Sequence, residues 1–168
     1  VYRGLPPIGK NEDAIFESAQ SINLDVDWGD YPYVTSSSVM PSMIYGINNV
    51  IGVMKAYHTR VGDGPPNHPD LPWLREAGKE YGTTTGRARK CTWNDMDSIK
   101  YSISIAQPKE IVVAKVDILK DVKDIKVYEN NQEMTIGNLD SYINYLLENI
   151  PEFKWMSDSP KGDLIRMR

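Results

Sequence analysis

The chain has little of what several common protein classes require. Its 168 residues contain one cysteine, Cys91, so no disulfide can form within the chain. No apolar run approaches the roughly 20 residues that a membrane-spanning helix needs, and Val1–Pro7 lack the apolar stretch of a secretory signal. These absences predict a protein of the cytoplasm with no membrane partner.

Positive charge is also scarce. The chain carries 19 Lys and Arg residues against 23 Asp and Glu, which gives a formal net charge of −4. Because there is no basic stripe, we expect no nucleic-acid partner, although a few local arginines suffice to hold a small anion. Apolar material is plentiful: 40% hydrophobic residues, with four Trp and ten Tyr, are enough for the buried core of one domain.

Two polar runs have the composition of ligand-binding loops. The first spans residues 27–37 and the second spans 81–89, and both are rich in glycine and hydroxyl residues, which are poor core material. In the second run, glycines allow the backbone to approach a ligand, while Arg87 and Arg89 offer planar forks for carboxylate or phosphate. The pattern indicates an anionic ligand.

The alternation of strand-like and helix-like segments predicts an α/β fold. We expect a strand region over 14–26, interrupted at 18–21, and a helix over 43–57 because its apolar residues have helical spacing. The rest of the expected order is a surface connection over 61–72, a helix capped by Asn94 that runs to about Ala106, strands over 111–116 and 125–128, a helix from about Asn138 to Asn149, and a strand over 153–156.

A charged pair lies at the end of the strand expected at 111–116. Open α/β sheets bind ligands outside the carboxyl ends of their strands, and Lys115 and Asp117 lie at such an end. The Asp117 carboxylate could accept two hydrogen bonds from a purine edge while the Lys115 stem lies over the base. Taken alone, this Lys-x-Asp motif is weak, and solvated charges at a strand end explain it better.

Five sequence blocks, in order and with similar spacing, resemble the C-terminal half of adenylosuccinate synthetases. The resemblance runs from Ile15 nearly to the end of the chain, and its blocks are residues 16–21, 30–37, 55–65, 81–87 and 114–117. It implies that residues 1–168 form the C-terminal half of one α/β domain with a central, mostly parallel sheet, related to the fold of P-loop NTPases.

Members of that family are ligases that join L-aspartate to a 6-oxopurine nucleotide. A nucleoside triphosphate phosphorylates the purine O6, and the aspartate amine then displaces that phosphate with the help of Mg²⁺. The resemblance therefore implies that IMP is the acceptor, that GTP or ATP is the phosphoryl donor, that Mg²⁺ is the cofactor and that the protein is a homodimer.

The resemblance also implies roles for individual residues. Gln20 would be the catalytic glutamine that contacts the purine near O6, Thr35 would bind the 5′-phosphate, and Val61 would contact the ribose through its backbone. The carboxylates of aspartate would bind to Thr83, Thr84, Thr85, Gly86 and Arg87, and Arg87 would also touch the ribose. The triphosphate donor would bind to Arg89, Lys115, Asp117, Ser157 and Ser159.

The chain departs from the family pattern in three places. The family's glycine-rich phosphate loop, its magnesium-binding catalytic aspartate and its histidine acid belong to an N-terminal half that is absent here. This absence predicts that the segment is inactive alone and holds no metal site.

Ser18 and Ser21 replace glycines beside Gln20, and the segment after Ser37 is shorter than in the family. In the turn at 157–160, Asp158 and Ser159 replace the threonine and the glycine of the family. The identity of the donor base therefore stays open.

The histidines of this chain are not expected to replace the missing acid. His58 lies at a position where the family tolerates serine, and His68 lies in a proline-rich loop, so we expect both to be structural or solvated.

Three functions stay open at this point. The first is the ordinary IMP-dependent ligase. The second is that of a divergent bacteriophage branch of the family, which acts on dGMP with ATP or dATP; the hydroxyls of Ser18 and Ser21 would suit the extra 2-amino group of guanine. The third is a half-domain that binds nucleotides and is inactive alone.

Overall fold

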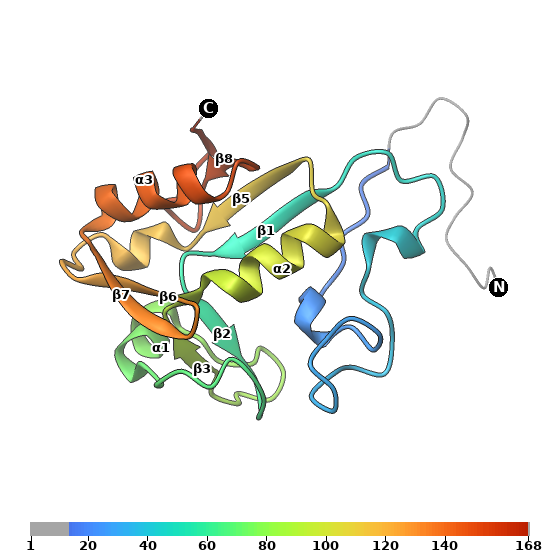
Figure 1. The fold of residues 1–168 in the computed structure, drawn as a ribbon, viewed down its shortest axis with the longest axis horizontal. Coiled ribbons are helices and arrows are strands. Elements are labelled where there is room, and N and C mark those ends of the chain that lie inside the picture. The colour runs from blue at the N-terminus through green and yellow to red at the C-terminus, as the bar shows by residue number, and fades with distance from the viewer. Residues whose placement is uncertain (1–13, 168) are drawn as a thin grey trace.

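The computed structural model describes residues 14–167, and a four-stranded sheet lies at its centre (Figure 1). The strand order is β1 (Ile51–Lys55), β5 (Glu110–Ala114), β8 (Phe153–Met156) and β9 (Ile165–Arg166). The first three strands pair in parallel, and β9 pairs antiparallel with β8. The prediction of an α/β fold with a mostly parallel central sheet is confirmed.

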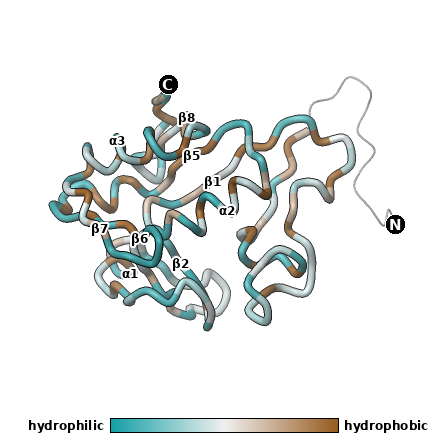
Figure 2. Tube along the Cα trace, viewed as in Figure 1, coloured by the Kyte–Doolittle hydropathy of each residue, from teal (hydrophilic) through white to brown (hydrophobic). Residues whose placement is uncertain are grey.

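Two smaller sheets accompany the central one. One joins β2 (His58–Arg60) antiparallel to β3 (Lys90–Thr92). The other runs β4–β6–β7, formed by Asn94–Asp95, Ile125–Glu129 and Gln132–Gly137, with β4 parallel and β7 antiparallel to β6. Figure 2 shows the hairpin between β6 and β7 in the hydrophilic colour, and most residues of β7 are exposed.

The helices are short. They are α1 (Pro72–Gly78), α2 (Met96–Ala106) and α3 (Leu139–Asn149), with single 3₁₀ turns η1 (Ile22–Leu24), η2 (Pro41–Met43) and η3 (Val116–Leu119). Within residues 14–167, none of the helices combines the length and the apolar character that crossing a membrane demands.

Side-chain caps begin the two longer helices. The Asp95 carboxylate accepts a hydrogen bond from the Ser98 amide at 2.9 Å at the start of α2, and the Asn138 side chain accepts one from the Ser141 amide at 3.0 Å at the start of α3. The predicted helices are therefore confirmed, but the cap of α2 is Asp95 and not Asn94. The Asn94 amide is buried instead and donates to the Tyr142 hydroxyl at 2.8 Å.

Two sequence predictions are wrong. Residues 14–26 form no strand and contain only the turn η1, and the helix expected over 43–57 is replaced by the turn η2 and strand β1. Strand β1 exists because it pairs in parallel with β5 over its whole length, a contact that local spacing cannot reveal. It lies at the edge of the sheet, where Ile51 and Val53 are largely exposed.

The core lies between the sheets and α3. It is built from side chains of β5, β6, β8 and α3 that are completely or almost completely buried, including Val113, Ile125, Val127, Leu146 and Phe153. Cys91 of β3 belongs to the same cluster, and burial raises the pKa of its thiol to about 11.

The Tyr142 hydroxyl offers a test of this core. It accepts from Asn94 and donates to the Ala56 carbonyl at 2.9 Å, with all three residues buried. Tyr142→Phe leaves two buried polar groups without this partner, so we expect the free energy of unfolding to fall by about 1–3 kcal/mol in urea denaturation.

The control is Tyr45→Phe, because Tyr45 is fully exposed and its variant should change stability by less than about 0.5 kcal/mol. Equal stabilities of the two variants would contradict the proposed role of the Tyr142 hydroxyl.

Candidate functional site

The carboxyl ends of three parallel strands meet at one edge of the central sheet. Lys55 ends β1, Lys115 follows β5, and Ser157 follows β8. Backbone hydrogen bonds join the last two: the Val116 amide donates to the Ser157 carbonyl at 3.3 Å, and the Ser157 amide donates to the Val113 carbonyl at 2.9 Å. Ligands of open α/β sheets bind at such an edge.

Four of the residues predicted for the donor base lie together there. Lys115 has a left-handed backbone (φ 65°) and precedes η3, whose first turn contains Asp117. Beside them, the Ser157 hydroxyl donates to the Ser159 carbonyl at 3.1 Å. The strand-end position predicted for Lys115 and Asp117 is therefore confirmed, and the 157–160 turn lies next to it.

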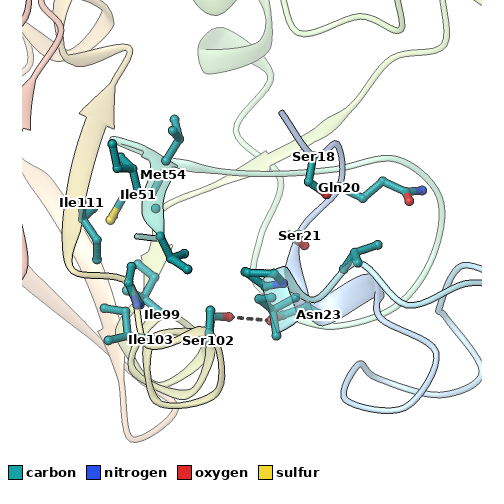
Figure 3. Close-up of a pocket in the computed structure, with 18 of the residues that line it drawn as sticks. Ser18, Gln20, Ser21, Asn23, Ile51, Met54, Ile99, Ser102, Ile103 and Ile111 are labelled. Carbon is teal, nitrogen blue, oxygen red and sulfur yellow. Dashed lines mark hydrogen bonds between the residues drawn. The ribbon is translucent and has the colours of Figure 1, made fainter. Parts of the chain in front are cut away.

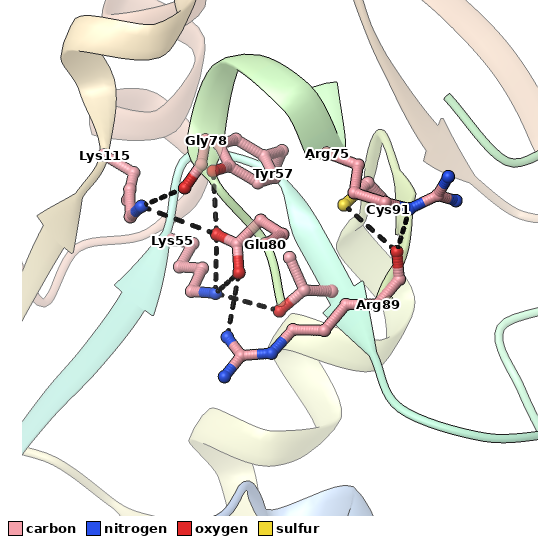
Figure 4. A network of polar contacts seen from close by, with 9 residues as sticks. Lys55, Tyr57, Arg75, Gly78, Glu80, Arg89, Cys91 and Lys115 are labelled. Atoms are coloured by element: carbon pink, nitrogen blue, oxygen red, sulfur yellow. Dashed lines mark hydrogen bonds and ion pairs between the residues drawn. The ribbon is translucent and has the colours of Figure 1, made fainter. Parts of the chain in front are cut away.

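A buried carboxylate, Glu80, adjoins the same edge (Figure 4). It accepts hydrogen bonds from Lys55 Nζ at 2.7 Å, from Arg89 Nη1 at 2.8 Å and from the Tyr57 hydroxyl at 2.8 Å. Lys115 Nζ lies 3.7 Å from the Glu80 carboxylate. The structure thus brings Arg89 and Lys115, both predicted to bind the triphosphate donor, to one carboxylate that sequence reasoning missed.

Lys115 has a second anchor in α1. Its ammonium group donates to the Gly78 carbonyl at 2.6 Å. Gly78 is required here because a Cβ at this position would overlap the Tyr57 hydroxyl. Lys115 and the Glu80 carboxylate together therefore link the ends of α1, β1 and β5.

The protonation states of the cluster follow from its contacts. Burial alone would raise the pKa of the Glu80 carboxyl, but hydrogen bonds from Lys55 and Tyr57 and the nearby charges outweigh it, so the pKa lies below its ordinary value. Burial, with the Glu80 hydrogen bond, raises the pKa of Tyr57. Glu80 is therefore ionised at neutral pH, and Tyr57 is a hydrogen-bond donor.

The second polar run folds into a narrow loop. Tyr81 and Ala88 form an isolated β-bridge, and the Gly82 amide donates to the Arg87 carbonyl at 2.8 Å. Gly86 has φ 63°, a left-handed conformation that favours glycine. The residues of the tip at 83–87 are exposed above a base formed by Glu80 and Arg89, and the Thr85 hydroxyl accepts from the Arg87 amide at 3.3 Å.

The first polar run is organised by Asp25, which is completely buried. The Asp25 carboxylate accepts hydrogen bonds from the Ser38 hydroxyl and the Val39 amide, both at 2.7 Å, and from the amides of Asp27 at 2.9 Å and Trp28 at 3.2 Å. Although burial opposes ionisation, these bonds lower the pKa of Asp25 to about 2. One carboxylate therefore holds both ends of the run.

Arg60 ties the first run to the segment after β2. Its guanidinium donates to the carbonyls of Tyr33 at 2.8 Å, Asp63 at 2.8 Å and Pro65 at 2.7 Å. Thr35, predicted to bind the phosphate of the nucleotide, lies two residues after Tyr33. Val61, predicted to contact the ribose of the same nucleotide, directly follows Arg60. Sequence reasoning did not assign a role to Arg60.

Gln20 lines a cavity that reaches the end of β1, where Lys55 and Tyr57 also line it. Gln20 has φ 76°, and Ser18 and Ser21 line the same open and largely apolar cavity of about 470 Å³ between the N-terminal segment, β1 and α2. In Figure 3 its amide points away from the apolar side chains of β1, β5 and α2. Among the described residues, no hydrogen bond joins Gln20 to Thr35, Val61 or the 83–87 tip, so the structure does not bring it to them directly.

Both histidines are integrated into the fold. His68 stacks on Tyr128 with ring centroids 3.6 Å apart, and its Nε2 lies 2.6 Å from Asp95 Oδ2. Burial lowers the pKa of His58 to about 4, so it is neutral at pH 7. The described part of the chain also contains no group of three or more His, Cys, Asp or Glu side chains that could hold a metal ion.

A sequence profile described as Adenylosuccinate synthetase matches residues 7–156, which include every predicted site residue up to Asp117. The chain belongs to the adenylosuccinate synthetase family. The adenylosuccinate synthetase of Malacoplasma penetrans is 38% identical over 160 residues, covering 86% of this chain and 36% of the relative. That of Endomicrobium trichonymphae is 40% identical over 132 residues, covering 71% and 31%. The chain thus spans about a third of the length of these relatives.

Two solved structures share the adenylosuccinate synthetase fold. A fully ligated adenylosuccinate synthetase from Plasmodium falciparum superposes with a TM-score of 0.80 at 27% identity, covering 90% of this chain and 49% of that one. The succinoaminodeoxyadenylate synthetase of cyanophage S-2L, bound to dGMP and dATP, superposes with a TM-score of 0.59 at 19% identity, covering 89% and 45%. The second likeness concerns the fold alone.

The lowered pKa of Asp25 predicts an acid dependence of stability. Folding lowers this pKa from its ordinary value of 3.8 to about 2, so the ionised carboxylate stabilises the fold above about pH 4, and its contribution is lost as the pH falls from 4 to 2. Asp25→Asn should reduce the free energy of unfolding at pH 7 by about 2 kcal/mol and flatten this part of the pH profile.

Urea denaturation between pH 2 and pH 7 measures both effects. The control is Asp121→Asn, which changes an exposed carboxylate and should retain the wild-type profile. A wild-type profile in Asp25→Asn would show that this carboxylate does not hold the loop.

Proposed function

We propose that the chain forms the nucleotide- and aspartate-binding part of a ligase that joins L-aspartate to C6 of IMP, with hydrolysis of a nucleoside triphosphate and through a 6-phosphoryl intermediate. The observation that carries this proposal is the gathering of Arg89, Lys115, Asp117 and the 157–160 turn at the carboxyl edge of the sheet. Family membership and the 38–40% identity to adenylosuccinate synthetases support it.

At this edge the donor base would bind between two elements. The Asp117 carboxylate accepts from the base, the Lys115 stem covers it, and Ser157 and Ser159 line the opposite side. Arg89, at the base of the 81–89 loop, faces the phosphates. Because a carboxylate can accept from the edge of either guanine or adenine, the proposal takes GTP or ATP as donor.

The exposed loop tip would bind L-aspartate. Its two carboxylates require several donors, and the hydroxyls of Thr83, Thr84 and Thr85 supply them together with the Arg87 guanidinium, which can bind one carboxylate through two nitrogens. Gly86 allows the tight turn that directs Arg87. Arg87 also reaches the ribose of the acceptor.

The acceptor nucleotide would bind along the first polar run. Thr35 donates to its 5′-phosphate, Val61 contacts its ribose through the backbone, and Gln20 contacts the purine near O6. The hydrogen bonds from Arg60 support this assignment for Thr35 and Val61, because they hold the two segments together.

The proposal includes Mg²⁺, which supplies charge neutralisation on the phosphates. Because the described residues form no acidic or histidine cluster that suits a metal ion, none of them is assigned to it. We also propose a homodimer in the cytoplasm, and that the remaining catalytic groups belong to the part of the family domain that this chain does not match.

The second candidate acceptor is dGMP. One observation favours it: Ser18 and Ser21 both line the cavity beside Gln20, where their hydroxyls suit an extra amino group. IMP is preferred because the likeness to the Plasmodium falciparum adenylosuccinate synthetase is greater, in sequence and in fold, than the likeness to the cyanophage enzyme.

A competition experiment tests these proposals. The protein is incubated with L-aspartate, Mg²⁺, IMP, dGMP, GTP and ATP, the products are identified by mass spectrometry, and nucleotide binding is measured by calorimetry. Succinylated IMP supports the main proposal, and succinylated dGMP supports the second candidate. Nucleotide binding without product supports a binding unit that is inactive alone, and neither binding nor product refutes all three.

Arg87 is the sharpest residue-level test of the aspartate site. In the complete ligase, Arg87→Leu removes a two-point charged contact worth about 1.5–3 kcal/mol, so the aspartate concentration for half-maximal product formation should rise by about tenfold or more. Lys100→Leu, which removes a cation from α2 that pairs with Glu129, is the control and should leave this concentration unchanged. An unchanged requirement in Arg87→Leu would remove Arg87 from the aspartate site.

A further inference from the structure

We propose that Glu80 is a positioning residue of the nucleoside-triphosphate subsite, whose buried carboxylate holds Arg89 and Lys115 where they meet the donor. This inference rests on the proposed function, which assigns those two cations to the donor.

The backbone fixes Glu80 from both sides. It follows Lys79, the left-handed cap of α1 (φ 52°), and the Glu80 amide donates to the Arg75 carbonyl at 2.9 Å. Its own carbonyl accepts from the Arg89 amide at 3.0 Å. The backbone of Glu80 is therefore fixed between α1 and the 81–89 loop. Glu80 binds Arg89 twice, through its backbone carbonyl and through its carboxylate.

The charges around Glu80 are not balanced. Three cations, Lys55, Arg89 and Lys115, surround this one carboxylate, so positive charge is in excess around it. The Glu80 side chain is 2% exposed, whereas those of Lys55, Arg89 and Lys115 are 28%, 30% and 38% exposed. The anion is thus covered by cations whose outer sides reach solvent, and such a cluster attracts a chain of phosphates.

The carboxylate is what keeps these cations together. Like charges held around one point repel each other unless a counter-charge lies between them. Without the Glu80 charge, Lys115 keeps the Gly78 carbonyl but loses its ion pair, and the Arg89 guanidinium loses the charged partner that directs it. Donor binding should then weaken, while the apolar packing of the core, to which Tyr57 belongs, does not depend on this charge.

The test compares Glu80→Gln, which keeps the size but removes the charge, with the wild type. GTP and ATP, each with Mg²⁺, are titrated into each protein by calorimetry, and circular dichroism gives the folded fraction at the same temperature. We expect donor affinity to fall by about tenfold or more at an unchanged folded fraction. A purely structural role would lower affinity only in proportion to the folded fraction.

The control is Glu133→Gln, because Glu133 of β7 forms an ion pair with Lys126 of β6 at the surface. This variant should bind the nucleotides with the affinity of the wild type. Wild-type affinity in folded Glu80→Gln overturns the inference. If Glu80→Gln does not fold, Glu80→Asp is measured instead, since it keeps the charge but withdraws it by one methylene. Weaker donor binding by Glu80→Asp supports the inference, and wild-type affinity overturns it.

A wild type that binds neither nucleotide refutes the proposed function itself, and the inference with it, before any variant is compared.

Discussion

One buried negative charge sets the layout of the candidate site. A carboxylate can leave water only when cations and hydrogen bonds replace its solvation. Glu80 satisfies this condition because three cations surround it: Lys55 at the end of β1, Arg89 at the base of a loop and Lys115 directly after β5. Because each cation comes from a different element, the same interaction that solvates the carboxylate also fixes those elements relative to one another.

The same principle orders the regions that have little regular structure. The segment from 20 to 40 is too rich in polar residues to have a core of its own, yet Asp25 accepts four hydrogen bonds from it. Arg60 does the same with three carbonyl groups from two segments. In this fold, buried charges provide for loops the order that apolar packing provides for strands, and the loops so ordered carry most of the predicted ligand residues.

Local sequence patterns predicted the elements whose causes are local. Helices α2 and α3 and strands β5, β6 and β8 were predicted to within a few residues, although the cap of α2 is Asp95 and not the expected Asn94. Strand β1 was mistaken for a helix because its identity comes from pairing with a strand nearly sixty residues away. The strand-end rule located Lys115 and Asp117, whereas Glu80 and Asp25 were missed, since nothing near them in sequence reveals that a carboxylate is buried.

The burial of Cys91 has a practical consequence. Its thiol lies inside the core and, with a pKa of about 11, stays protonated at neutral pH, so it reacts slowly with maleimides and similar reagents. A cysteine introduced at an exposed position, such as Thr84 at the tip of the 81–89 loop, would therefore take up a fluorophore selectively in the otherwise unaltered chain. The native sequence is thereby suited to site-specific labelling, and the movements of that loop can be followed by fluorescence without first removing its own thiol.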